Sequence, residues 1–149
     1  MHTHTQTRTQ TRTQLVTFTL DRLHFGVEVS HVQEVIRYQT MTRVPRAPAV
    51  VEGLINLRGQ IVTAVDMRAR VGLGKRDGSR LPMNVVIRST DGVASLLVDE
   101  IGEVVEVDAA QLEPAPLSVS DRIRDVIGGV YKLHGMLLLE LDVERALTI

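Results

Sequence analysis

The acidic side chains that could do chemistry gather in one short stretch of the chain. That stretch runs from 99 to 108 and contains Asp99, Glu100, Glu103, Glu106 and Asp108. Closely placed carboxylates can act as a general acid and base or hold a cation. Valine and isoleucine residues interleave with these carboxylates, which is typical of the solvated edge of a buried element. A cation site also needs oxygens that converge from a fixed loop, so we expect no metal here.

Other catalytic groups are sparse. Two of the five histidines, His2 and His4, lie near the start of the chain, and none of the five has the histidine partner of an HExxH helix. The chain has no cysteine, which excludes disulfides and thiolate catalysis. No glycine pattern matches a phosphate-binding loop. These patterns predict a protein that is not an enzyme and binds no cofactor, with an enzyme built on the 99–108 carboxylates as an open alternative.

The bulk composition argues against two further classes of protein. The net charge is −1, whereas nucleic-acid-binding proteins usually carry a basic excess. Two Phe, two Tyr and no Trp are few rings for a β-barrel that stacks bases, so such a module is a distant alternative. No apolar run approaches the roughly 18 residues that a membrane span requires. We therefore expect a cytoplasmic protein with no nucleic-acid partner and no segment inserted in a membrane.

With enzymes and nucleic-acid-binding modules disfavoured, the sequence favours a surface that binds another protein. The most informative residue of such a surface is Arg58. This arginine lies at the tip of an apolar hairpin that runs from Gly53 to Asp66. Glycine allows the tight turn at Gly59 and a bend or close approach at Gly53. Two interpretations of Arg58 fit: a solvated residue at a turn, or part of a polar rim, with Glu34, around an apolar groove. A guanidinium suits the second role because it offers a planar donor fork on an aliphatic stem.

Alternating apolar residues indicate short strands separated by tight turns. We expect strands at 15–20 and 25–29 and in the hairpin 53–66, and a single helical turn directly after the hairpin. Residues 1–14 are rich in Thr and Gln and have no large apolar residue after the first, so we expect a disordered tail.

A short helix is expected after the second strand. Ser30 and Gln33 have the spacing of a capping box. Val32, Val35 and Ile36 follow at helical spacing. This pattern would place Glu34 on the wet side of a helix.

The second half of the chain repeats the plan of the first. The hairpin at 129–142 resembles the hairpin at 53–66 at an offset of 76 positions, with His134 in the place of Arg58. Four identities relate the two hairpins: Gly53/Gly129, Leu57/Leu133, Gly59/Gly135 and Asp66/Asp142. Ile101, Val104 and Val105 match Val32, Val35 and Ile36 at an offset of 69, so about seven residues are inserted between, near 118–125. Such agreement in order and spacing indicates an internal duplication.

Short strands with tight turns curl into small barrels, and two such units gain by packing on one another. We predict an all-β protein of two β-barrel subdomains with short helices. The first repeat covers about 15–80 and the second about 81–149. The pattern leaves open whether the copies are sequential or exchange strands.

Several segments resemble the CheW family of bacterial chemotaxis coupling proteins. The resemblance runs from about Leu15 to the end of the chain, and the Asn-Leu-Arg-Gly hairpin followed by Asp-Met-Arg is its most specific part. It implies two SH3-like five-stranded β-barrels without enzymatic activity. It also implies an adaptor that joins the cytoplasmic tip of a methyl-accepting chemoreceptor to the regulatory domain of the CheA histidine kinase, and so a protein recruited to membrane receptor arrays.

The resemblance also carries over functional positions. In the family, the matching positions are associated with partner binding or with shaping the binding surface; in this chain they are Val32, Glu34, Gly53, Arg58, Gly59 and Val104. The sequence departs from the family at Thr63-Ala64, where a proline is common, and at Met67, where leucine is usual. A coupling protein of a pilus-linked or other chemosensory pathway remains an alternative to chemotaxis proper.

Overall fold

The computed structural model describes residues 12–76 and 78–149, and strands make up most of them. Sheet A contains, in spatial order, β8 (Glu100–Asp108), β1 (Arg12–Leu20), β2 (Leu23–Glu28), β10 (Met136–Leu141) and β9 (Ile127–Leu133). Sheet B contains β3 (Val32–Ile36), β6 (Met83–Ser89), β7 (Gly92–Val98), β5 (Gln60–Asp66) and β4 (Val51–Leu57). The predicted all-β class with two five-stranded sheets is confirmed.

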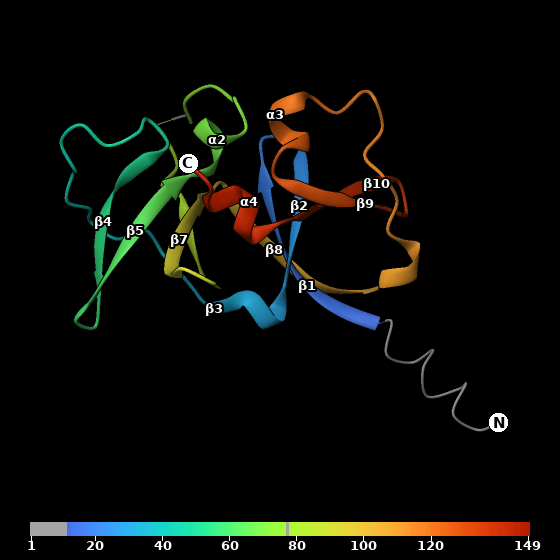
Figure 1. Cartoon of the computed structure of the whole chain (residues 1–149), viewed down its shortest axis with the longest axis horizontal. Coiled ribbons are helices and arrows are strands. Elements are labelled where there is room, and N and C mark those ends of the chain that lie inside the picture. Colours follow the sequence, from blue (N-terminus) through green and yellow to red (C-terminus); the bar gives the residue numbers. More distant parts are fainter. Residues whose placement is uncertain (1–11, 77) are drawn as a thin grey trace.

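The two sheets share one plan. Neighbouring strands are antiparallel except for one parallel pair in each sheet, β2 with β10 and β5 with β7. Each sheet draws strands from both halves of the chain, since β1 and β2 join β8–β10 while β3–β5 join β6 and β7. The sheets lie side by side in Figure 1, with the last helix between them.

Most of the apolar core lies where the two sheets meet. Its largest cluster contains residues of both, among them Phe18 and Phe25 of sheet A with Ile87 and Leu96 of sheet B. The Phe18 and Phe25 rings stack with centroids 5.3 Å apart. Two smaller clusters lie within the separate sheets, one around Tyr131 and one around Ile55. Because aromatic residues are few, close packing of aliphatic side chains supplies most of the buried surface.

Two matched glycines show the duplication in the backbone. A Cβ atom added at Gly53 would lie 2.7 Å from the carbonyl oxygen of Thr42. A Cβ atom added at Gly129 would lie 2.7 Å from the carbonyl oxygen of Glu113. In both copies a preceding segment crosses the hairpin strand and forms an isolated antiparallel bridge beside the glycine. Glycine is therefore needed for close approach of two backbones at both sites.

Short helices follow the matched hairpins. Asp66 and Asp142 occupy the N-caps of α2 (Met67–Arg70) and α4 (Val143–Leu147), and each side chain accepts a backbone N–H. A third short helix, α3 (Asp121–Arg124), lies in the segment inserted in the second repeat and is capped by Ser120. The 3₁₀ turns η1 (Val29–His31) and η2 (Ala109–Gln111) complete the elements.

The prediction of a short helix after Ser30 is wrong. Residues 29–31 form only a 3₁₀ turn without a side-chain cap, and 32–36 form strand β3, which pairs with β6. The matching residues 101, 104 and 105 also lie in a strand, β8. Val32, Val35 and Ile36 are β-branched and satisfy a strand as readily as a helix. Pairing with β6 decides between them, and β6 lies about fifty positions away along the chain.

The predicted disordered tail at residues 1–14 extends too far into the chain. Arg12, Thr13 and Gln14 belong to strand β1 and pair with the end of β8. The Arg12 side chain also forms an ion pair of 2.9 Å with Glu106. Residues 1–11 lie outside the described part of the chain, so the prediction for them stays a prediction. Within the described residues, no helix is long and apolar enough to cross a membrane.

We expect Gly53→Ala and Gly129→Ala each to lower the free energy of unfolding by about 1–3 kcal/mol, because the new methyl group overlaps a backbone carbonyl. Urea unfolding measures this change. Gly128→Ala is the matched control, because its Cβ would meet only the Glu140 carboxylate, at 3.9 Å. A Gly53→Ala protein as stable as the parent would show that this close approach imposes no constraint.

Candidate functional site

The turn between β4 and β5 contains two consecutive residues with positive φ. Arg58 has φ of 50° and Gly59 has φ of 90°, so both lie in the left-handed region. Leu57 pairs directly with Gln60, which leaves a two-residue turn of the kind that twists with its strands. The Asn56 side-chain oxygen accepts the Gly59 N–H at 2.8 Å. Gly59 therefore shapes the tip, and Arg58 projects from it with 70% of its side chain exposed.

Arg58 and Glu34 lie in contact. The NH2 group of Arg58 donates a hydrogen bond to a carboxylate oxygen of Glu34, and the two charges form an ion pair. Glu34 lies on β3 at one edge of sheet B, whereas Arg58 follows β4 at the opposite edge. The ion pair thus joins the two edges of the curled sheet. The Glu34 side chain is 22% exposed, so this end of the pair is partly enclosed.

The pair alters the titration of its acid. Hydrogen bonding to the Arg58 guanidinium lowers the pKa of Glu34 below its ordinary value, and partial burial opposes this only in part. The same contact raises the pKa of Arg58. Both groups are therefore charged at neutral pH, and the site presents a fixed dipole at the tip of the hairpin.

The remaining predicted positions do not all meet there. Val32 is half-buried on β3 and packs against the main core. Gly53 is buried beneath the crossing segment at Thr42 and presents no side chain to a partner. Val104 lies on β8 in sheet A and is 55% exposed. The structure thus brings Arg58, Gly59 and Glu34 together and places Val104 on the other sheet.

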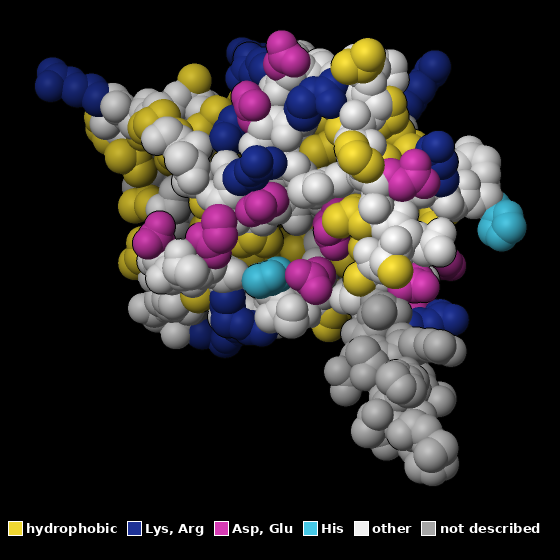
Figure 2. Space-filling model, turned by 45° about the vertical axis from the view of Figure 1, so that its right-hand side comes forward, with side chains coloured by type: hydrophobic (Ala, Val, Ile, Leu, Met, Phe, Trp, Pro, Cys, Tyr) yellow, Lys and Arg dark blue, Asp and Glu magenta, His cyan; other side chains and the backbone are white. Residues whose placement is uncertain are grey.

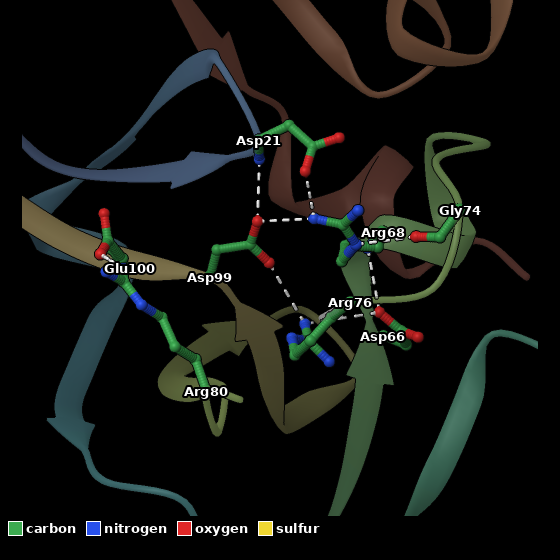
Figure 3. Close-up of polar contacts among 8 residues, drawn as sticks. All are labelled: Asp21, Asp66, Arg68, Gly74, Arg76, Arg80, Asp99 and Glu100. Carbon is green, nitrogen blue, oxygen red and sulfur yellow. Dashed lines mark hydrogen bonds and ion pairs between the residues drawn. The ribbon is translucent and has the colours of Figure 1, made fainter. Parts of the chain in front are cut away.

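A polar cluster around Arg68 was missed by the sequence-based search. The Arg68 side chain is 9% exposed, and its NH1 atom donates to Asp21 and to Asp99, each at 2.6 Å. Its Nε atom donates to the Gly74 carbonyl at 2.8 Å. Asp99 also accepts the backbone N–H of Asp21 at 2.8 Å. Figure 3 shows both carboxylates turned toward the guanidinium, with Arg76 between Asp99 and Asp66, next to the second carboxylate oxygen of Asp99.

The Arg68 cluster fastens α2 to the other sheet. Asp21 lies in the β1–β2 turn of sheet A, while α2 continues from β5 of sheet B. A matching contact exists in the second copy, where Glu144 of α4 accepts hydrogen bonds from Thr90 in the β6–β7 turn at 2.8 and 3.0 Å. The helix that follows each hairpin therefore contacts a turn between two strands of the opposite sheet.

The carboxylates at 99–108 thus have separate roles. Asp99 belongs to the Arg68 cluster, Glu100 pairs with Arg80, and Glu106 pairs with Arg12. Among residues 12–76 and 78–149, no three His, Asp or Glu side chains lie close enough together to hold a metal ion. The 99–108 stretch therefore contributes ion pairs along and beside β8.

The comparison with known proteins decides the family. The family model described as a CheW-like domain matches residues 14–149. The chain belongs to the CheW-like family. Similar proteins include the chemotaxis protein CheW of Rhizobium meliloti, 32% identical over 131 residues, which are 87% of this chain and 84% of that protein. The chemotaxis protein CheW of Klebsiella aerogenes is 27% identical, over 91% of this chain and 81% of that protein.

The fold agrees with a solved CheW structure. The scaffolding protein TtCheW from Thermoanaerobacter tengcongensis superimposes with a TM-score of 0.82 at 27% identity, over 92% of this chain and 93% of that one. Two SH3-like subdomains and a scaffold and coupling role in chemotaxis, both implied by the sequence resemblance, are thereby confirmed. CheW-like proteins are non-enzymatic adaptors, and the matches support neither a nucleic-acid module nor an enzyme of the 99–108 carboxylates.

The ion pair predicts a low titration midpoint for Glu34. Its native pKa is depressed, so the pair stabilises the fold above pH 4.5, and this contribution is lost as the pH falls through the native pKa. We expect an NMR titration of side-chain carboxyl carbons to place the pKa of Glu34 below 4.5. Arg58→Gln should raise this midpoint, whereas His134→Gln at the other hairpin tip should not. A Glu34 midpoint unaffected by Arg58→Gln would show that the pair does not form in solution.

Arg68→Met should lower the free energy of unfolding by about 3 kcal/mol, because it leaves the partly buried Asp99 carboxylate without the nearer of its two arginines. Thermal or urea unfolding measures the loss. Glu144→Gln, which changes the matching but exposed contact, should cost less than about 1 kcal/mol. Equal effects of the two substitutions would contradict a special contribution of the Arg68 cluster.

Proposed function

We propose that this protein joins the cytoplasmic tip of a methyl-accepting chemoreceptor to the regulatory domain of a CheA-type histidine kinase. Membership in the CheW-like family supports this proposal. Support from the structure comes from the Arg58–Glu34 pair, which presents a charged, exposed tip on a rigid two-residue turn. The protein acts by holding two partners together and makes or breaks no covalent bond.

The receptor tip binds at the Arg58 end of sheet B in this proposal. A guanidinium has five N–H donors, and the contact with Glu34 engages only part of them. Arg58 can therefore donate hydrogen bonds to a second carboxylate, from a receptor helix, without releasing Glu34. Glu34 fixes the direction of the guanidinium, so little side-chain freedom is lost on binding.

Apolar contacts complete the proposed receptor surface. Val104 is 55% exposed on β8 and offers the larger apolar contact, while Val32 supports β3 from within. The glycines at 53 and 59 set the position of the hairpin that carries Arg58. In this proposal the receptor bundle contacts both sheets, through Arg58 of sheet B and Val104 of sheet A.

The kinase binds elsewhere, through apolar strand ends of the barrels, and leaves the receptor surface open. Each single contact of this kind is weak, so stable coupling arises from many copies in an array. The protein in this proposal works in the cytoplasm and is recruited to membrane-bound receptor arrays.

Arg58→Glu should abolish capture of a receptor signalling fragment while lowering the thermal unfolding midpoint by only about 5 °C or less, because the substitution removes one exposed ion pair and no part of the core. A pull-down with the receptor fragment and the kinase as two separate baits measures the coupling. His134→Glu introduces the same side chain at the matching tip and should leave receptor capture intact.

The kinase bait serves as the internal control, because Arg58→Glu should still bind it. Normal receptor capture by Arg58→Glu would disprove the role assigned to Arg58. Failure of the parent protein to capture either bait would disprove the bridging function itself.

A further inference from the structure

Four arginines gather where the three short helices meet. Arg70 belongs to α2, Arg122 and Arg124 belong to α3, and Arg145 belongs to α4. The Arg122 side chain donates to the Ala69 carbonyl of α2 at 2.9 Å, which ties α3 to α2. In Figure 1 these helices lie near one another in the middle and upper middle of the molecule, and the C-terminus lies beside α2.

Backbone carbonyls hold all four guanidinium groups in place. Arg70 donates to the carbonyls of residues 145, 146 and 148 at 3.0–3.1 Å, which satisfies the end of α4. Arg124 donates to the carbonyls of residues 115, 116 and 119 at 2.7–3.1 Å. Arg145 donates to the Ile127 carbonyl at 2.9 Å. The arginines are therefore oriented rather than free to rotate.

Most of the other oriented arginines have a carboxylate partner, whereas Arg88, like these four, is held by backbone carbonyls, those of Ser30 and Val32. Arg12, Arg58, Arg68, Arg76 and Arg80 each lie within 4.0 Å of a carboxylate. In the part of the chain that the structure describes, Arg70, Arg122, Arg124 and Arg145 form no such ion pair. Neutral carbonyls satisfy N–H donors but leave the positive charge uncompensated.

A shallow pocket opens between these side chains. It has a volume of about 470 Å³ and is lined by Arg70, Arg124, Asp125, Arg145 and Thr148. The lining has two more positive than negative side chains, although the whole chain has a net charge of −1. In the upper part of the face shown in Figure 2, several Lys and Arg side chains lie at the surface, with a few Asp and Glu side chains among them.

Helix capping alone does not account for this charge. Cations near a helix C-terminus interact with its partial negative charge, which amounts to roughly half an elementary charge in a long helix. The helices here contain only four or five residues, and their dipoles are correspondingly small. Three guanidinium groups in one pocket exceed what such short helices neutralise.

We infer that this arginine pocket is a docking surface for a carboxylate-rich segment of a protein partner. The planar fork of arginine matches a carboxylate, and several guanidinium groups can each take one carboxylate of an extended acidic segment. The pocket is open rather than enclosed, so a single small anion in it would stay hydrated and bind weakly. Glu28, Glu140, Asp142 and Glu144 line a second pocket at the start of α4, and their charge would confine an acidic segment to the arginine side.

The arginine pocket is separate from the proposed receptor surface. All seven residues of β5 lie between the Arg58 tip and the start of α2, a span of roughly 23 Å at the usual rise of a strand. The two surfaces can therefore be occupied together. The inference does not depend on the receptor and kinase assignments, and it adds a third contact to the adaptor.

A fluorescent ten-residue peptide of alternating Glu and Gly tests the inference by anisotropy with the full chain. We expect saturable binding that weakens as the salt concentration is raised from about 50 to about 200 mM. Arg145→Glu should weaken binding at least ten-fold, and Arg145→Lys, which keeps the charge but loses the planar fork, should weaken it less than Arg145→Glu does. The matched control is Arg43→Glu, which makes the same charge change in the exposed loop before β4.

Three outcomes would overturn the inference: no binding at millimolar protein, an equal loss in Arg43→Glu, or displacement of the peptide by inorganic phosphate at similar concentrations. The last would identify a small-anion site in place of a docking surface. If Arg145→Glu fails to fold, the NMR signals of the Arg70 and Arg124 Nε–H groups in the parent protein decide the matter. Shifts of these signals on adding the peptide support the pocket, and their constancy at saturation overturns it.

Discussion

The packing of sheet A against sheet B is the interaction on which the rest of the structure depends. A five-stranded sheet of short strands buries too little surface to be stable alone, and the largest core cluster takes residues from both sheets. The strand order strengthens this dependence, because each sheet contains strands from both halves of the chain. Neither half can therefore complete its sheet or its core without the other, and the two subdomains form one cooperative unit.

The duplication explains why the same kinds of contact join the two sheets in both copies. Both copies use a glycine for a close backbone crossing and an aspartate to cap the helix that follows the hairpin. Each helix then contacts a turn between two strands of the opposite sheet, through Arg68 in one copy and Glu144 in the other. The first contact is largely buried and the second is exposed, so the two polar contacts differ in strength. The backbone geometry is the same in both copies.

The same divergence distributes charge over the surface. The hairpin tip of sheet B carries Arg58, paired with Glu34, whereas the matching tip of sheet A carries His134. The insertion in the second copy adds α3, whose arginines join those of α2 and α4 at the other end of β5. A pseudosymmetric scaffold thus presents two different cationic sites, one with a carboxylate partner and one held by carbonyls. In the proposed function, this asymmetry gives the receptor and an acidic partner separate surfaces.

The strands with clear alternation, the glycine turn, the duplication and the family could be predicted from the sequence, because these depend on neighbouring residues or on recurring motifs. The strand at residues 32–36 could not be predicted in this way, since pairing with β6 overrides their helical spacing. Only the tertiary structure decided the exchange of strands and the partners of the charged side chains. Glu34 and Arg58 are 24 positions apart, and Arg68 and Asp99 are 31 apart. Local pattern cannot specify which distant charges meet, because chain topology and core packing bring them together.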